Sequence, residues 1–206
     1  MSTFFATQNL FPSSDPTVDL ALVQVSLGDV SRFDVRLTPT SLLTTDADLK
    51  ALNIAPGTDL FFSGMFSEYL GTDRMEPMVR FGRVSLLPYG KVSFGGVPED
   101  LILAEVFSFG GNSGSPVFYY QGIDRSYGSI AAGPPVVKLA GVMQGFFPGN
   151  EHPIGTAEPV AGANTQAAPG QRGLPVFPPN SGIAAIVPAQ KILDILNSAE
   201  VHLRQR

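Results

Sequence analysis

The residues best suited to chemistry lie in one short segment, Gly110 to Pro116, whose sequence is GGNSGSP. A serine attacks a carbonyl carbon where a tight turn exposes its hydroxyl and where backbone N–H groups stabilise the oxyanion that forms. Glycines at positions 111 and 114 flank Ser113 and permit such a turn. The segment predicts a nucleophilic serine of the acyl-transfer type. The alternative interpretation is an ordinary Gly/Ser hairpin without chemistry.

This pattern differs from the nucleophile turn of the α/β-hydrolases. That turn reads Gly-x-Ser-x-Gly and joins a strand to a helix. Here Ser115 stands at the position of the second glycine, and apolar segments of strand type lie on both sides of the turn. The sequence therefore disfavours the α/β-hydrolase class.

The segments that must position Ser113 are short and mostly of strand type. Runs of Val, Leu, Ile and Phe, bounded by Gly and Pro, predict strands at residues 18–25, 33–37, 59–65, 78–87, 101–107, 136–147 and 182–187. A Thr or Asp N-cap predicts one or two helical turns within residues 44–52, and a one-sided apolar face predicts a helix at Ala189–Leu196. Residues 148–180, rich in Gly, Pro and Ala without periodicity, predict a long, mobile surface loop.

The composition of the 206-residue chain favours a β-rich domain and excludes several functions. Its 22 Gly and 18 Pro favour many turns and argue against a helical bundle, and 44% hydrophobic residues suffice for one core. A net charge of −5, with Lys and Arg scattered singly, excludes a basic surface for nucleic acid. The absence of Cys excludes a thiol nucleophile, a disulfide framework and cysteine-ligated zinc.

The first residues, MSTFFATQNLF, lack the basic region and the apolar core of a signal peptide. No stretch reaches the ~18 apolar residues that a membrane-spanning helix needs. We therefore expect a soluble chain without an export signal or a membrane span, and the sequence indicates no particular compartment.

Around Ser113 the chain resembles the trypsin-like serine peptidases, specifically their HtrA/Deg-like branch. The segment Gly111-Asn112-Ser113-Gly114-Ser115-Pro116 is similar to the nucleophile signature of that family, and VDLALVQV at residues 18–25 is similar to the strand that carries the triad aspartate. Residues 55–64, 139–145 and 181–196 are similar to a turn and strand of the first barrel, to the strand that pairs with substrate, and to the last strand and terminal helix. The resemblance covers about residues 17–198.

The resemblance implies an all-β fold of two antiparallel β-barrels, with the active site at their junction and a C-terminal α-helix. Residues 1–206 then form a single peptidase domain, with about 1–90 as an incomplete first barrel, about 91–188 as the second barrel and 189–198 as the helix. The resemblance implies Ser113 as the nucleophile, Asp19 as the residue that orients the base, and the N–H groups of Gly111 and Ser113 as the oxyanion hole. It implies no metal and no other cofactor.

The catalytic triad is incomplete in this sequence. In the family, the general-base histidine lies several tens of residues before the aspartate, but only eighteen residues precede Asp19 and none is His. We expect this chain to be a very poor hydrolase, since loss of a triad member leaves only about 10³–10⁴-fold catalysis over water. Asp19 also has a second interpretation, as a structural carboxylate that accepts backbone N–H bonds.

The other titratable groups offer little replacement for this histidine. His152 lies in the predicted loop after the substrate-pairing strand and would approach Ser113 from an unusual side, and His202 lies in the C-terminal tail. A self-contained enzyme that uses His152 therefore ranks last. An acidic cluster beside two arginines is interpreted as a solvated loop; it comprises Glu68, Asp73 and Glu76, with Arg74 and Arg80.

The resemblance also implies where a substrate would lie. Phe107, six residues before Ser113, corresponds to the floor of the specificity pocket. Because no carboxylate lies at the implied positions, we expect a preference for small or medium apolar residues rather than Lys or Arg at the cleavage site. The implied substrate-binding residues are Phe107, Met143, Gln144, Gly145, Phe146 and Gly182.

Two hypotheses of different classes remain open. The first is a serine endopeptidase domain that forms an acyl-enzyme on Ser113 and is inactive in this chain because the base is missing. The second is a pseudopeptidase, a module that binds an extended peptide by β-augmentation along Leu139–Gly145. Both predict an extended peptide or protein as the partner. The missing first-barrel strands predict self-association or a partner chain over the open edge.

Overall fold

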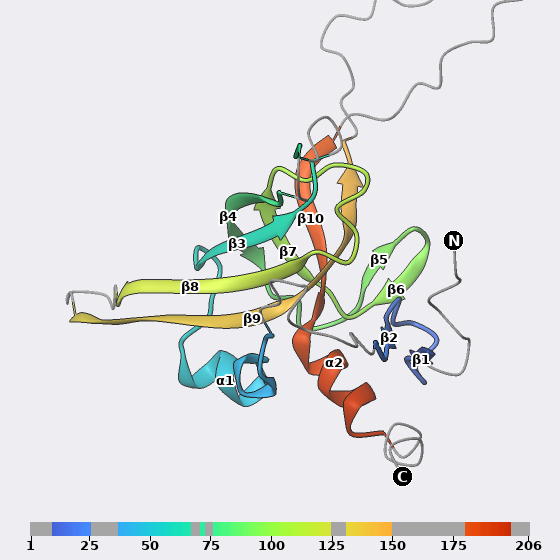
Figure 1. Ribbon diagram of the computed structural model, residues 1–206, viewed down its shortest axis with the longest axis horizontal. Helices are drawn as coiled ribbons and strands as arrows, with labels where there is room; N and C mark the ends of the chain where they lie inside the picture. Colours follow the sequence, from blue (N-terminus) through green and yellow to red (C-terminus); the bar gives the residue numbers. More distant parts are fainter. Residues whose placement is uncertain are drawn as a thin grey trace, which may run out of the picture.

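Six antiparallel strands close into one barrel in the computed structural model, which describes residues 10–25, 37–66, 71–72, 76–124, 131–149 and 180–198 (Figure 1). The order around the barrel is β10-β7-β4-β3-β8-β9. The bounds of these strands are β3 Asp59–Gly64, β4 Met78–Leu86, β7 Ile102–Val106, β8 Pro116–Asp124, β9 Ala131–Pro148 and β10 Asn180–Pro188. A C-terminal helix, α2 (Ala189–Leu196), follows β10 directly. The expectation of a mostly β fold with a barrel and a C-terminal helix is thus confirmed.

The described residues contain one barrel. β3 and β4, which the resemblance assigns to an incomplete first barrel, pair with each other, and they also pair with β8 and β7 respectively. Chain segments before and after residue 90 therefore contribute to the same closed barrel. Each of these six strands has a ladder partner on both sides over at least part of its length.

The hydrophobic core fills the interior of this barrel. Along β3, Leu60 and Phe62 face inward and are 1% and 0% exposed, while the residues between them face outward, as the period of a strand requires. Burial also raises the pKa of the Tyr119 phenol, which lies in this core. The core comprises Ile54, Leu60, Phe62, Val84, Ile102, Ala104, Val106, Val117, Tyr119, Ala140, Met143, Ala184 and Ile186.

The N-terminal part of the described chain forms a small separate sheet. β1 (Leu10–Pro12) and β2 (Ala21–Val23) pair with each other. The prediction of one buried strand at 18–25 is wrong, because only three of these residues form a strand and only Val18 is buried. The reason is that a two-stranded sheet covers one face at most: Leu20 and Leu22 pack against Phe11 and Ile195 of α2, and the rest stays exposed.

A second hairpin, which the sequence analysis missed, covers the outer face of β9 and β10. β5 (Val92–Phe94) and β6 (Val97–Glu99) are joined by Gly95 and Gly96, both at positive φ, a pair that is typical of tight hairpins. The Phe94 ring meets the Phe147 ring edge-on at 5.1 Å, which packs the hairpin against β9. Two adjacent glycines between apolar residues were the available sequence signal.

Both predicted helices are present. α1 (Asp46–Ala51), preceded by the 3₁₀ turn η3 (Thr40–Leu42), begins with a capping box between Thr45 and Asp48. Hydrogen bonds from the backbone and side chain of Thr45 lower the pKa of the Asp48 carboxyl. Lys138 of β9 donates to the Ser41 carbonyl at 2.9 Å and ties this region to the barrel. None of the described helices is long and apolar enough to cross a membrane.

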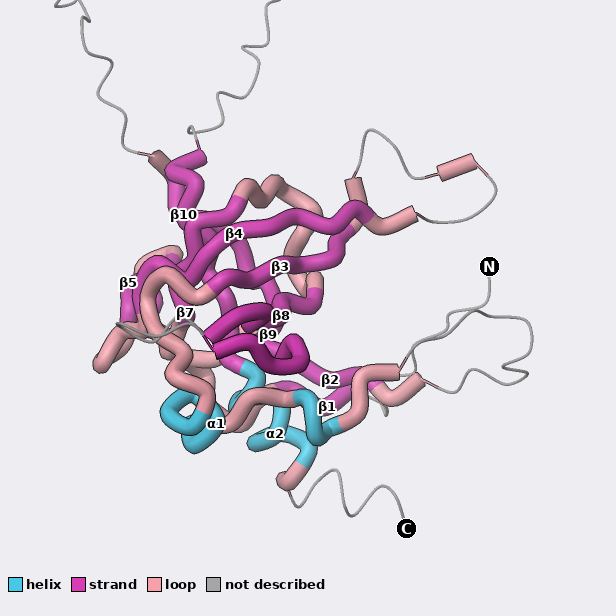
Figure 2. The backbone as a smooth tube through the Cα atoms, turned by 90° about the vertical axis from the view of Figure 1, so that its left-hand side faces the viewer, coloured by secondary structure: helices cyan, strands magenta, loops and turns pink. Residues whose placement is uncertain are grey.

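The two ends of the barrel differ. Figures 1 and 2 both show the helices and the β1–β2 sheet toward one end, and the start of β10 with the finish of β9 toward the other. β8 and β9 continue beyond the barrel as a two-stranded arm (Figure 1). Residues 33–36 of the strand predicted at 33–37, and residues 150–179 of the predicted loop, lie outside the described part of the chain.

The close approach of β9 and β10 at Gly141 is testable. A Cβ atom at this position would overlap the backbone carbonyl oxygen of Val187, so Gly141→Ala is expected to lower the free energy of unfolding by about 3 kcal/mol in urea titrations. Gly90→Ala is the matched control, because no atom lies within 4 Å of its added Cβ, and it should change stability by less than about 0.5 kcal/mol. Equal stability of the two variants would contradict the close contact between Gly141 and the Val187 backbone.

Candidate functional site

Ser113 lies in the connection between β7 and β8, and its side chain is exposed. Gly111 has φ +95° and Gly114 has φ +83°, a backbone region that glycine adopts without the steric cost of a side chain. Ser115 N donates to the Asn112 carbonyl at 3.1 Å and closes the turn around Ser113. The glycines therefore have the conformational role that the sequence pattern predicts.

The turn is docked onto β9. Gly114 N donates to the Met143 carbonyl at 2.7 Å, and Met143 N donates to the Ser115 carbonyl at 2.8 Å. The Ser113 hydroxyl donates to the carbonyl of Gln144 at 2.7 Å. An amide carbonyl is a very weak base, so this bond orients the hydroxyl without activating it.

The two backbone N–H groups expected to form an oxyanion hole are available. Among the described residues, neither Gly111 N nor Ser113 N donates a hydrogen bond, whereas Asn112 N between them donates to the Phe109 carbonyl at 3.2 Å. A pair of unused N–H groups beside a serine hydroxyl can stabilise an anionic oxygen.

Asp19 and Ser113 line the same cavity, of about 600 Å³, between the N-terminal segment and the barrel. Asp19 is exposed, and Asp15 and Gln144 also contribute to the lining. Hydrogen bonds from the side chain and backbone of Thr17 lower the pKa of Asp15. The structure therefore brings the two predicted triad residues to one cavity, whose lining contains no cationic side chain.

The described part of the chain contains no histidine that could act as the general base for Ser113, because His152 and His202 both lie outside it. Three more of the predicted titratable residues, Glu68, Asp73 and Arg74, also lie outside the described ranges.

Of the six predicted substrate-binding residues, Met143 and Gln144 line this cavity, whereas the expected pocket residues Phe107, Phe146 and Gly182 do not. Phe107 is 62% exposed and packs edge-on against Phe109, with ring centroids 5.0 Å apart. Phe146 is the register partner of the core residue Ala184, so its side chain lies on the inward face of β9. Gly182, at φ +80°, donates its N–H to Asn180. The predicted apolar preference stays a prediction.

Gln144, whose carbonyl accepts the Ser113 hydroxyl, is hydrogen-bonded to β6. The side chain of Gln144 donates to the Glu99 carboxylate at 2.8 Å, and Glu99 is only 5% exposed. Gly145 lies under the Phe94 ring, where an added Cβ would be 3.1 Å from the ring edge. The β5–β6 hairpin thus supports two of the predicted substrate-binding positions, Gln144 and Gly145, from outside the barrel.

Sequence reasoning misplaced Arg80. Its guanidinium is not simply solvated: it donates to the Phe107 carbonyl at 3.2 Å and lies over the Phe109 ring at 4.9 Å. The sequence signal was its position in β4, at period two from Gly82 and Val84, on the inward face of the strand. Asn180, which holds the Ser108 carbonyl, had no comparable sequence signal.

Known proteins add no identification. The chain matches no protein-family model, and it has no significant match among curated proteins or solved structures. The described part of the chain contains no group of three or more His, Cys, Asp or Glu residues that could hold a metal ion.

Ser108, five residues before Ser113, offers a test of the packing beneath the turn. Its side chain is 1% exposed, and its hydroxyl has no hydrogen-bond partner among the described residues. Because a buried, unpaired polar group costs about 1–3 kcal/mol, Ser108→Ala is expected to raise the free energy of unfolding by about 1 kcal/mol in urea titrations. Ser181→Ala, which removes an exposed hydroxyl that donates to the Phe147 carbonyl and accepts from Ile183 N, should be slightly destabilising. A clear loss of stability in Ser108→Ala would show that the hydroxyl has a partner.

Proposed function

We propose that this chain contains the nucleophile-bearing barrel of a trypsin-like serine endopeptidase domain. The observation that carries the proposal is the setting of Ser113: a glycine turn between two strands of a closed antiparallel barrel, beside two unused N–H groups and on one cavity with Asp19. The proposal includes the finer fold of that family, in which the segment around Asp19 belongs to the other barrel.

The described residues account for part of the reaction. Ser113 Oγ would attack the carbonyl carbon of a peptide bond, and its proton would pass to a base. The resulting oxyanion would accept hydrogen bonds from the N–H groups of Gly111 and Ser113. The proton would then go to the leaving amine as the C–N bond breaks, and water would release the acyl group from Ser113.

The remaining requirement is the base. For attack to begin, the base must replace the Gln144 carbonyl as the acceptor of the Ser113 hydroxyl proton. In the family an imidazole does this, and Asp19 lies on the cavity where it would orient such a ring. We therefore propose that the chain is a very poor hydrolase until a base occupies this cavity.

Added imidazole tests the proposal. The full chain is incubated with a fluorophosphonate probe, with and without imidazole, and labelling is followed by intact mass. Imidazole should raise the labelling rate about tenfold. This is less than the 10²–10⁴-fold effect of a base that the protein itself positions, because free imidazole is not held in place. Ser113→Ala should abolish labelling, and Asp19→Asn should reduce the imidazole effect.

The matched control is Ser115→Ala, which removes a neighbouring hydroxyl from the same turn and should leave imidazole-dependent labelling intact. Labelling that persists in Ser113→Ala, or a folded chain that imidazole leaves unlabelled, would refute Ser113 as an acyl-transfer nucleophile.

A second candidate function is a peptide-binding module, favoured by the free side of β9. The β8 ladder with β9 stops at the pair Pro116 and Val142, whereas the β10 ladder continues to Pro148. Of the segment predicted for β-augmentation, Leu139–Val142 already pair with β8, whereas within the described residues Gly145–Phe147 have a strand neighbour on one side only. An extended peptide could add a strand there by β-augmentation.

This candidate predicts binding without chemistry. A blocked tetrapeptide of alanine and valine should shift the amide resonances of Gly145 to Phe147 in ¹H–¹⁵N spectra of Ser113→Ala. The same peptide with N-methylated backbone amides should cause no shift, because it cannot donate the ladder hydrogen bonds. Shifts that survive N-methylation, or that fall outside β9 and the Ser113 turn, would exclude β-augmentation.

A further inference from the structure

The segment that leads to Ser113 has no ladder partners of its own. β7 ends at Val106 and β8 begins at Pro116, so the backbone of residues 107–115 lies outside both strands. Backbone N–H and C=O groups in a packed site need partners elsewhere. Side chains from other parts of the barrel supply several of them.

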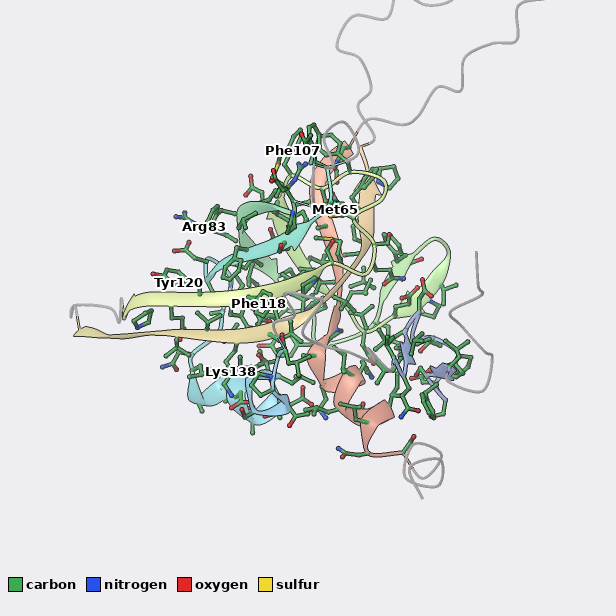
Figure 3. The ribbon with its side chains drawn as sticks, viewed as in Figure 1. Met65, Arg83, Phe107, Phe118, Tyr120 and Lys138 are labelled. Carbon is green, nitrogen blue, oxygen red and sulfur yellow. The ribbon has the colours of Figure 1, made fainter. Side chains whose placement is uncertain are left out.

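Arg80 holds the first carbonyl of this segment. It is the register partner of the core residue Phe62, so it lies on the inward face of β4, near the start of the strand. From there its guanidinium donates to the Phe107 carbonyl at 3.2 Å and lies 4.9 Å from the centre of the Phe109 ring. Figure 3 shows Phe107 and Met65 toward the same end of the barrel, with Arg83 apart from both.

Asn180 holds the next carbonyl. It is the first residue of β10, and its Nδ2 donates to the Ser108 carbonyl. Its Oδ1 accepts the Gly182 N–H at 2.8 Å, which fixes the amide in this orientation. One side chain thus links the start of β10 to the residue after Phe107.

Asn112 completes the set from within the turn. It is 3% exposed; its Oδ1 accepts from Phe109 N at 3.0 Å, and its Nδ2 donates to the Met65 carbonyl at 3.0 Å. Three consecutive residues, 107 to 109, are therefore each held through a backbone group by a side chain. The next residues, Gly110 and Gly111, have no side chains to restrain them.

We propose that Arg80 and Asn180 are positioning residues of the Ser113 turn. By fixing the carbonyl groups of Phe107 and Ser108, they set the orientation of the glycine segment and so of the Gly111 and Ser113 N–H groups. The inference rests on the proposed function only for its effect on reactivity. Its structural content stands on the hydrogen bonds above. A preorganised oxyanion site needs such support, because glycines restrain their own N–H groups poorly.

The test uses the full chain and two variants. Arg80→Met keeps the aliphatic stem and removes the donor, and Asn180→Asp keeps the acceptor for Gly182 N and removes the donor to Ser108. Both should shift the ¹H–¹⁵N resonances of Gly111 and Ser113. Arg80→Lys, which retains a donor and a cation, should recover the Arg80→Met shift in part. Asn180→Asp decides the question alone if Arg80→Met does not fold.

Arg83→Met is the control for Arg80. Arg83 lies in the same strand but faces outward, and it pairs with Asp59 at 2.9 Å with its side chain 65% exposed. This variant should leave both resonances unchanged. Resonances of Gly111 and Ser113 that do not move in folded Arg80→Met or Asn180→Asp would overturn the proposal.

Reactivity supplies the second readout. In the imidazole-assisted fluorophosphonate assay, Arg80→Met and Asn180→Asp should lower the labelling rate about 10- to 100-fold, as expected for a small displacement of the reacting groups. An unlabelled wild-type chain would refute the proposed function, while the resonances would still decide the role of Arg80 and Asn180. Shifted resonances with an unchanged labelling rate would overturn the effect on reactivity.

Discussion

Barrel closure depends on the pairing of β9 with a strand on each side. One edge of β9 forms a ladder with β8 and the other with β10. The ladder between β9 and β10 joins the first and last strands of the order and so closes the barrel. At Gly141 the two backbones approach so closely that no side chain fits. Two residues later, Met143 is buried in the core while its backbone receives the Ser113 turn. The strand that closes the barrel therefore also positions Ser113.

β9 has a bulge at Gln144, directly after the residue whose backbone holds the Ser113 turn. Met143 pairs with Ile186 and Gly145 pairs with Ala185, so Gln144 is an extra residue between them. Its carbonyl accepts from Ser113, and its side chain reaches Glu99 on β6. The same local irregularity thus gives the serine hydroxyl its only acceptor among the described residues.

Local sequence signals predicted both helices, most strands of the barrel and the turn, but they predicted neither the β5–β6 hairpin nor the long-range contacts. The capping residues of α1, the apolar face of α2 and the two glycines around Ser113 act within a few residues, so a pattern in the sequence is enough. The grouping of β3 and β4 with the later strands depends on ladders between segments tens of residues apart. The contact of Arg80 with the Phe107 carbonyl was not predicted for the same reason, since the two residues are 27 positions apart in the chain. For β2, a short apolar run suggested burial, but a two-stranded sheet offers too little cover.

Ser113 and Asp19 share a cavity, but they lie in parts of the structure that differ in how much apolar packing holds them. Ser113 is held by the closed barrel, whereas Asp19 lies just before β2, in a segment that packs on α2 through the small cluster around Phe11 and Leu22 and on β10 through Val18. Segments with few buried apolar contacts open locally at a lower free energy than the fold as a whole. Detachment of residues 10–25 would separate Asp19 from Ser113 while the barrel stays folded. Hydrogen exchange at β1 and β2 would then report the fraction of molecules in which the two halves of the site are assembled.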